Sequence, residues 1–135
     1  MKLGFIGTGQ IAKATILGIL GSDLKINKIY ISQRNKKISS QLSKKSKKIF
    51  ILKDNQEIIN KSNWIFLSIT PDVGNKILKN LKFKSSQTII NFISTIGTSQ
   101  LKKYIKNRDK TVVKYTTHRF RRVKTFLTFL RKKKI

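Results

Sequence analysis

Three small residues near the start of the chain have the spacing of a dinucleotide-binding turn. Gly7, Gly9 and Ala12 form a G-x-G-x-x-A pattern directly after a short apolar run at 3–6. Gly7 permits a tight turn, Gly9 lets the main chain approach a pyrophosphate because it has no Cβ, and Ala12 allows the helix to pack closely on the strand. Unpaired N–H groups of the first helical turn would face the phosphates. The pattern predicts a dinucleotide cofactor, which itself supplies hydride-transfer chemistry.

The end of the second predicted strand carries the residues that would distinguish NADP from NAD. An NAD site usually has Asp or Glu about twenty residues after the glycines, where it binds the ribose 2′-hydroxyl. No acid lies between the strand predicted at 28–32 and Asp54. Ser32 can hydrogen-bond a 2′-phosphate, and Arg34 can form a charge-assisted pair with it. The sequence therefore favours NADP, with NAD as the alternative and Arg34 as an ordinary surface cation in that case.

Residues for other kinds of catalysis are sparse. His118 is the only histidine, and no carboxylate neighbours it in sequence, so we expect an incidental surface residue. The chain has no cysteine, which fits a reducing compartment, and the sequence predicts no metal site. We expect Trp64 to serve packing. Pro71, the only proline, fits both a rigid loop along the cofactor and the first position of a helix.

Alternating strands and short helices would position these residues. Strands are predicted at 3–6, 28–32, 48–52, 64–69, 88–93 and 111–115, and helices at 10–20, 35–46, after Asp54, after Pro71 and at 99–106. This alternation predicts an α/β fold, a doubly wound parallel Rossmann-type sheet in a single domain over 1–115. The cofactor crevice should lie outside the carboxyl ends of the strands, where 7–10, 32–35, 68–72 and 94–98 meet.

The composition changes abruptly near the C-terminus. Ile occurs twenty times in 1–110 and once in 111–135, whereas four of the six Arg fall within 119–135. We therefore expect 116–135 to form an irregular or helical basic tail, either an ordinary basic segment or one translated out of frame. The nine basic residues from Lys114 to the C-terminus, with no acid among them, predict poor packing of this tail through self-repulsion.

The net charge of +26 raises the question of a nucleic-acid partner. The basic residues are spread along the chain, as codon bias toward lysine would produce, so we expect only non-specific binding to polyanions. A dedicated basic nucleic-acid-binding protein is the less favoured alternative. No uncharged apolar run is long enough to span a bilayer, and Lys13 interrupts the apolar N-terminal stretch. The sequence predicts a cytoplasmic protein with no membrane partner.

Five segments resemble, in order and spacing, the N-terminal domain of pyrroline-5-carboxylate reductase. They are GFIGTGQIAKA at 4–14, SQRN at 32–35, DNQEI at 54–58, FLSITP at 66–71 and NFISTIG at 91–97. The resemblance covers residues 1–113. It implies an NAD(P)H-dependent reductase that transfers hydride to a cyclic imine, pyrroline-5-carboxylate, in the last step of proline synthesis.

The resemblance also implies a set of cofactor contacts, from the pyrophosphate to the nicotinamide. They are Gly7, Gly9, Gln10 and Ile11 beside the pyrophosphate, Ser32, Arg34 and Asn55 around the adenosine ribose and its phosphate, Ile69, Thr70 and Pro71 along the cofactor, and 94–97 near the nicotinamide.

The resemblance ends where the composition changes. In the family, the strand matching 111–115 leads through a proline-containing loop to an all-helical domain that forms the dimer and contributes substrate-binding residues. Here the loop reads TTHR at 116–119, without proline, and the sequence ends at residue 135. We therefore expect a truncated chain without the family's dimer interface and assign no catalytic residue. A non-catalytic nucleotide-binding remnant is the alternative.

Overall fold

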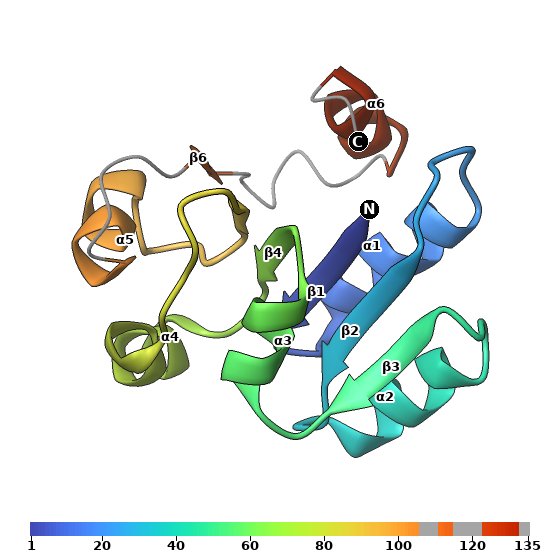
Figure 1. Cartoon of the computed structure of the whole chain (residues 1–135), viewed down its shortest axis with the longest axis horizontal. Helices are drawn as coiled ribbons and strands as arrows, with labels where there is room; N and C mark the ends of the chain where they lie inside the picture. Colours follow the sequence, from blue (N-terminus) through green and yellow to red (C-terminus); the bar gives the residue numbers. More distant parts are fainter. Residues whose placement is uncertain (106–110, 115–122, 133–135) are drawn as a thin grey trace.

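A parallel sheet forms the middle layer of the computed structural model, which describes residues 1–105, 111–114 and 123–132, with side chains for 1–105 and 127–132. Its strands are β1 (Lys2–Ile6), β2 (Lys28–Ser32), β3 (Ile49–Leu52), β4 (Trp64–Leu67), β5 (Thr88–Asn91) and β6 (Thr111–Lys114). They lie in the order β3-β2-β1-β4-β5-β6, and all neighbours are parallel (Figure 1). The strand order reverses between β1 and β4, so the predicted doubly wound Rossmann-type fold is confirmed.

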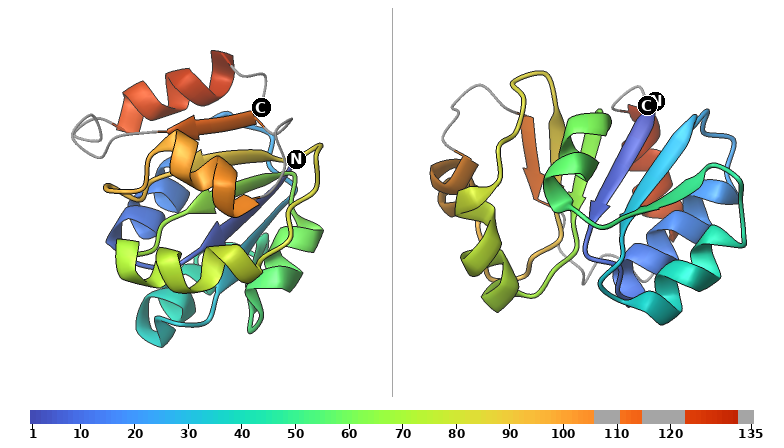
Figure 2. Two further views of the ribbon diagram at one scale, coloured as in Figure 1. Left: turned by 90° about the vertical axis from the view of Figure 1, so that its left-hand side faces the viewer. Right: turned by 60° about the horizontal axis from the view of Figure 1, so that its bottom comes forward.

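Helices cover both faces of the sheet (Figures 1 and 2). On one face, α1 (Gln10–Leu20) and α2 (Lys36–Ser43) enclose a core that includes Leu3, Phe5 and Ile31. On the other face, α3 (Asn55–Lys61), the 3-10 helix η1 (Leu78–Asn80) and α5 (Thr98–Ile105) contribute to a second core around Ile6 and Leu67. Between α3 and η1 in sequence lie β4 and α4 (Pro71–Ile77). The central strands are therefore buried on both sides, which is why their sequences are continuously apolar.

Aromatic rings fill the first core beneath the middle of the sheet. Phe5 and Phe66 stack with their centroids 4.4 Å apart and their planes 5° from parallel. Phe92 packs on Phe66 at 5.8 Å. Trp64 is 7% exposed and belongs to the same core, as predicted. This packing fixes the ends of β1, β4 and β5, where the loops of the candidate site begin.

Most element boundaries follow the predicted signals. Asp54 caps α3 by accepting a hydrogen bond from Gln56 N at 3.1 Å, and Pro71 occupies the start of α4. One helix and two strands are shorter than predicted. The helix expected at 35–46 is shorter, because Asn35 is its cap and not its first turn. The strands expected to reach 69 and 93 end at 67 and 91, because the chain turns away from the sheet there.

The C-terminal helix α6 (Val123–Lys132) packs beside α1 on the first face (Figure 2). Leu130 is fully buried in the first core, and Leu127 packs against the same cluster. The expectation of a poorly packed tail is therefore wrong for this segment. The helix directs Leu127 and Leu130 toward the sheet, whereas Arg131 stays exposed and finds an acidic partner in Asp23, so apolar burial outweighs charge repulsion.

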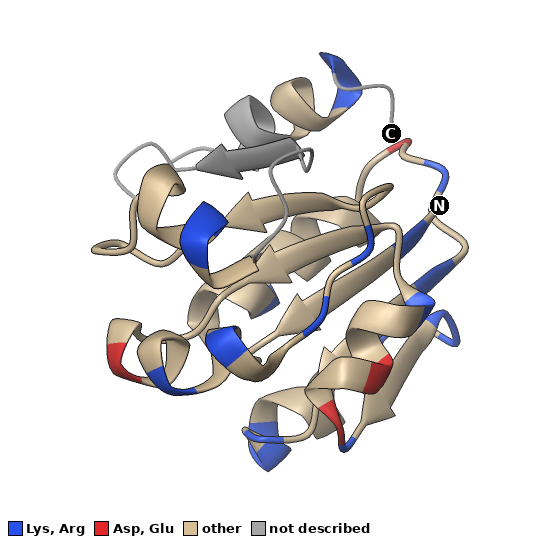
Figure 3. Cartoon of the chain, turned by 60° about the vertical axis from the view of Figure 1, so that its left-hand side comes forward, with Lys and Arg blue, Asp and Glu red and all other residues tan. Residues whose placement is uncertain are grey.

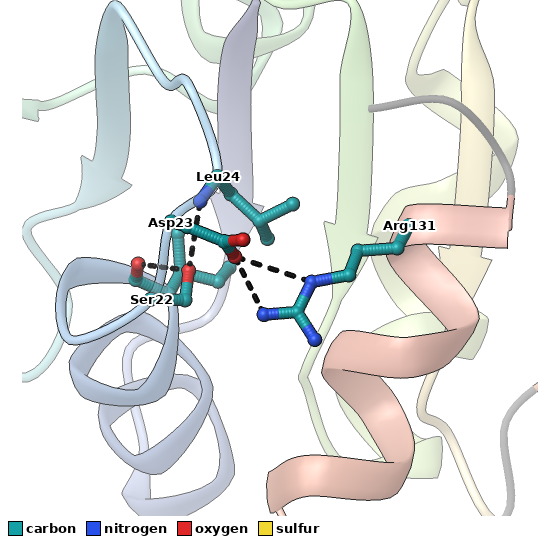
Figure 4. A network of polar contacts seen from close by, with 5 residues as sticks. Ser22, Asp23, Leu24 and Arg131 are labelled. Carbon is teal, nitrogen blue, oxygen red and sulfur yellow. Dashed lines mark hydrogen bonds and ion pairs between the residues drawn. The ribbon is translucent and has the colours of Figure 1, made fainter.

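The ion pair between Arg131 and Asp23 joins α6 to the turn that follows α1 (Figure 4). Arg131 Nε donates to Asp23 Oδ1 at 3.1 Å. This hydrogen bond holds the pKa of the Asp23 carboxyl below its usual value. Both side chains are largely exposed, so the ion pair contributes little to the stability of the fold and mainly fixes the orientation of α6.

Some sequence predictions fall on residues outside the described part of the chain. They are the assignment of His118 as an incidental surface residue and the loop at 116–119. Among the described residues, no helix combines the length and the apolar character needed to cross a bilayer.

Candidate functional site

The two glycines of the turn after β1 have different structural reasons to be glycine. Gly7 has φ +94°, and a Cβ there would lie 2.5 Å from the carbonyl oxygen of Ser68. Gly7 is therefore required by the fold, because it lets β1 turn beside the end of β4. A Cβ on Gly9 would meet no protein atom within 4 Å. The space above Gly9 is open, as a site that admits a ligand to the main chain requires.

Helix α1 presents an uncapped N-terminus at this open space. Gly9 is its cap residue and has no side chain to accept from the first-turn N–H groups, and no acid occupies that turn. Lys13 N donates to Gly9 O at 3.0 Å, which closes the first turn of the helix. The preceding amides and the helix dipole are thus available to an anion lying over Gly9.

A central groove of about 670 Å³ runs across the point where the strand order reverses. The glycine turn after β1 forms one of its walls, and the segment that follows β4 forms another. Its lining residues include Gly7, Gly9, Arg34, Ser68, Ile69 and Thr70.

Two smaller grooves extend the central groove toward opposite edges of the sheet. The β2–β3 groove, of about 350 Å³, shares Gly7, Arg34 and Ile69 with the central groove and adds Ser32, Lys53 and Asn55. The β5 groove, of about 400 Å³, shares Gly9, Ile69 and Thr70 and adds Gln10, Ile11, Pro71, Phe92 and Ser94. The three grooves meet at Ile69, which lines all of them.

All ten predicted cofactor-binding residues line these grooves. The residues assigned to the pyrophosphate side lie in the central and β5 grooves, those assigned to the adenosine ribose lie in the β2–β3 groove, and 69–71 lie between the two ends. The fold therefore gathers residues that are more than sixty positions apart in sequence along one edge of the sheet. Their contacts with a cofactor remain predictions.

The hydroxyl of Ser32, expected to reach a phosphate, is already engaged within the protein. It accepts from Gly7 N at 3.2 Å and lies 2.9 Å from Thr8 Oγ1. Thr8 Oγ1 also donates to the Ser32 carbonyl at 2.7 Å. These bonds join the end of β2 to the glycine turn, a role that was not predicted for either residue.

Asn91 and Lys53 also lie at the candidate site, although neither was predicted there from the sequence. Asn91 is fully buried at the end of β5, and its side chain holds the loop at 93–96 beside the β5 groove. A polar residue ending an apolar strand was an available signal for that role. Lys53 lines the β2–β3 groove from the end of β3. Nothing distinguished it in so lysine-rich a sequence.

Cationic side chains line two of the three grooves. Arg34 and Lys36 line the central groove, and Lys53 joins them in the β2–β3 groove. Among the residues that the structure describes, no acidic side chain lines any of these three grooves. Elsewhere in the view of Figure 3, Lys and Arg are scattered over several helices and loops and form no single stripe. This arrangement suits an elongated anion that carries a ring system at each end.

Comparisons with known proteins identify the fold and the family. The family model described as "NADP oxidoreductase coenzyme F420-dependent" matches residues 2–95. No curated protein matches the sequence. The solved 1-pyrroline-5-carboxylate reductase of Streptococcus pyogenes is 28% identical, with a TM-score of 0.70 over 84% of this chain and 41% of its own.

Two further structures share the fold at lower identity. Pyrroline carboxylate reductase of Plasmodium falciparum, solved with NADP bound, is 23% identical, with a TM-score of 0.67 over 84% of this chain and 41% of its own. Prephenate dehydrogenase of A. aeolicus, in complex with hydroxyphenyl propionate and NAD⁺, is 18% identical, with a TM-score of 0.68 over 84% and 40%.

The comparisons support the resemblance inferred from the sequence. This chain spans less than half the length of each of the three solved proteins and matches the pyrroline-5-carboxylate reductases in its N-terminal, Rossmann-type domain. It has the fold of an NAD(P)-dependent oxidoreductase. The family match over 2–95 covers most of the chain, which therefore belongs to the family of NADP oxidoreductases described as coenzyme F420-dependent.

Proposed function

We propose that this chain binds NADP along the joined grooves and serves a reductase whose substrate is the cyclic imine pyrroline-5-carboxylate. One observation carries the proposal. The open space over Gly9 lies between two grooves that extend to opposite sides of the strand reversal. A dinucleotide has the matching shape, because its two nucleoside halves flank a central pyrophosphate.

Each part of the cofactor has a groove of suitable chemistry. The pyrophosphate would lie over Gly9 and the first turn of α1, beside Gln10 and Ile11. The adenosine would occupy the β2–β3 groove beside Asn55. The nicotinamide would occupy the β5 groove along Pro71. This placement follows the general rule for doubly wound sheets, in which ligands bind outside the carboxyl ends of the strands at the strand reversal.

The residues present fit such a cofactor on structural grounds. A Cβ on Gly9 would project into the proposed pyrophosphate position, and the first turn of α1 offers amides with no acid to repel phosphate. When bound, NADPH supplies the hydride for reduction of an imine carbon. The chain's own part is to orient the nicotinamide. Pro71 limits the motion of one wall, and Asn91 fixes the loop that carries Ser94 on the other.

The choice of substrate rests on resemblance. The segments at 4–14, 32–35, 54–58, 66–71 and 91–97 resemble pyrroline-5-carboxylate reductase, and the S. pyogenes enzyme of that name is 28% identical. None of the family's substrate-binding residues is carried over to this chain, so the proposal names no catalytic residue. Cytoplasmic action is part of the proposal, on the sequence argument alone.

The binding proposal is tested by titrating the full chain with NADPH and with NADH. Calorimetry and cofactor fluorescence are used to monitor binding. We expect saturable binding of both, with NADPH bound more tightly. The same preparation should reduce pyrroline-5-carboxylate slowly or not at all, since positioning of the imine contributes about 7–11 kcal/mol of barrier lowering in such reactions. Absence of dinucleotide binding would refute the proposal, and rapid turnover would show that the chain completes its own substrate site.

A further inference from the structure

Thr8 and Ser32 form a closed set of hydrogen bonds below the glycine turn. Gly7 N donates to Ser32 Oγ, and Thr8 Oγ1 donates its single proton to the Ser32 carbonyl oxygen at 2.7 Å. The third bond, between the two hydroxyls at 2.9 Å, must therefore use the proton of Ser32. Both residues are buried, at 3% and 5% exposure. An ionised phosphate only accepts hydrogen bonds, so Ser32 has no free proton to donate to one.

Three cations from neighbouring elements surround the same end of the sheet. Leu52 pairs with Ser32 in the β2–β3 register, and Gln33 N donates to Leu52 O at 3.2 Å. Lys53 therefore leaves β3 next to the point where Arg34 follows β2. Lys36 begins α2, whose start is held by the Asn35 cap. All three cations line the β2–β3 groove and are exposed.

Nothing in the described structure neutralises these three cations. The ion pairs found among the described residues involve other basic residues, Lys61 and Arg131. Asp54 follows Lys53 directly, but its carboxylate accepts from Gln56 N at the start of α3 and does not line the groove. An unpaired cationic rim of this kind favours a dianionic group over a neutral hydroxyl.

The other wall of the β2–β3 groove is apolar. Ile69, Val73 and Ile77 line it from α4 and the segment before it. A flat heterocycle can pack on this wall while an attached phosphate lies at the cationic rim. The groove thus matches a purine nucleoside that carries an additional phosphate on its ribose, and it does so without the hydroxyl of Ser32.

We infer that Arg34, Lys36 and Lys53 together hold the 2′-phosphate of NADP, with Lys53 as a specificity-determining residue and Ser32 as a positioning residue. The inference rests on the proposed dinucleotide site and assigns its cofactor preference. Lys53 acts on NADPH alone, because NADH lacks the phosphate. Ser32 supports the turn beneath the pyrophosphate and therefore affects both cofactors.

The test compares dissociation constants for NADPH and NADH by calorimetry on the full chain and its Lys53→Gln, Lys36→Gln and Ser32→Ala variants. Lys48→Gln is the matched control, because Lys48 is exposed just before β3 and roughly 16 Å from Lys53 at about 3.3 Å per residue. That separation exceeds the Debye length of about 8 Å at physiological salt. The control therefore removes the same charge without touching the groove.

We expect Lys53→Gln to weaken NADPH binding by about tenfold or more, as for loss of one charge-assisted contact, and to leave NADH binding unchanged. Lys36→Gln should act in the same direction, Lys48→Gln should change neither constant, and Ser32→Ala should weaken both cofactors by one common factor. Equal effects of Lys53→Gln on both cofactors, or no effect, would overturn the inference and leave dinucleotide binding intact. A selective loss of NADPH in Ser32→Ala would also overturn it. If the wild-type chain binds neither cofactor, the proposed function fails, and the inference fails with it.

Discussion

The side-chain amide of Asn91 donates to the main-chain carbonyl of Ile96 at 2.8 Å and closes the loop after β5. Its oxygen accepts from Ile93 N at 2.9 Å, so both ends of the amide are used. Asn91 is fully buried beneath the segment that carries Ser94 into the β5 groove. One side chain thus ties the sheet to the loop proposed to face the nicotinamide.

Replacement of Asn91 should therefore cost stability and loosen the loop. Asn91→Ala leaves a buried N–H and a buried C=O without their partner, each worth about 1–3 kcal/mol. We expect the free energy of unfolding, measured by urea denaturation, to fall by about 2–4 kcal/mol. Amide exchange at Ile93 should become faster. Asn60→Ala, at an exposed helical position, is the control, and an equal effect of both substitutions would contradict the assigned role.

The two glycines of the turn should respond oppositely to a side chain. Gly7→Ala should destabilise the fold by more than about 1–2 kcal/mol, because it adds a clash with Ser68 O to a left-handed conformation. Gly9→Val should leave the melting temperature nearly unchanged, since its Cβ meets no protein atom within 4 Å, yet remove NADPH binding. Thermal melts and cofactor titrations separate the two effects. Unchanged NADPH affinity in the Gly9→Val variant would show that the pyrophosphate does not lie over Gly9.

Thr8 should matter for stability and not for the choice of cofactor. Thr8→Val keeps the side-chain volume but deletes the hydroxyl that donates to the Ser32 carbonyl. Leaving this buried carbonyl without its partner costs about 1–3 kcal/mol. We expect lower stability and weaker binding of NADPH and NADH by a similar factor, because the turn beneath both is less ordered. Ser86→Ala, at an exposed position before β5 that lines none of the three grooves, provides the comparison. A change in the NADPH to NADH preference would show that Thr8 contacts the ribose phosphate directly.

Local patterns predicted the elements of this fold well because each has a local cause. The apolar run at 64–67 reads as a buried strand, Asp54 as a cap and Pro71 as a helix start without any knowledge of their neighbours. The role of Ser32 depends on Thr8, which is 24 positions away and approaches only when β1 and β2 pair. Likewise, Lys53 can be placed beside Arg34 only when the register of β3 against β2 is known. Strand pairing brings these residues to the candidate site, and their residue types alone do not indicate this position.

The tail shows the opposite error, in which composition outweighed pattern. The absence of acid and the excess of Arg predicted repulsion, but the spacing of Leu127 and Leu130 is that of one helical face. In the structure that face lies on the first core beside α1. Charge density informs about solubility and partners, whereas apolar periodicity decides whether a helix can pack.

Leu130 should therefore contribute to the stability of the whole domain. It is fully buried, so Leu130→Ala should lower the free energy of unfolding by about 2–5 kcal/mol, as expected for loss of buried methyl groups. Lys132→Ala, exposed on the same helix, should change it little. Urea denaturation of both variants gives the comparison. Equal stability of Leu130→Ala and the wild type would mean that α6 does not pack on the core in solution.

Deletion of 116–135 extends the same test to cofactor binding. It should lower the melting temperature, because it exposes the part of the first core that Leu130 covers. NADPH affinity of the molecules that remain folded should stay within about threefold, since none of the described side chains of this segment, 127–132, lines the three grooves. A coupling below about 0.7 kcal/mol corresponds to that factor. A large loss of affinity at a temperature where the shortened chain is folded would show that α6 orders the glycine turn through α1. Whether the segment is translated out of frame is a separate proposal, which the nucleotide sequence around residues 113–120 tests directly.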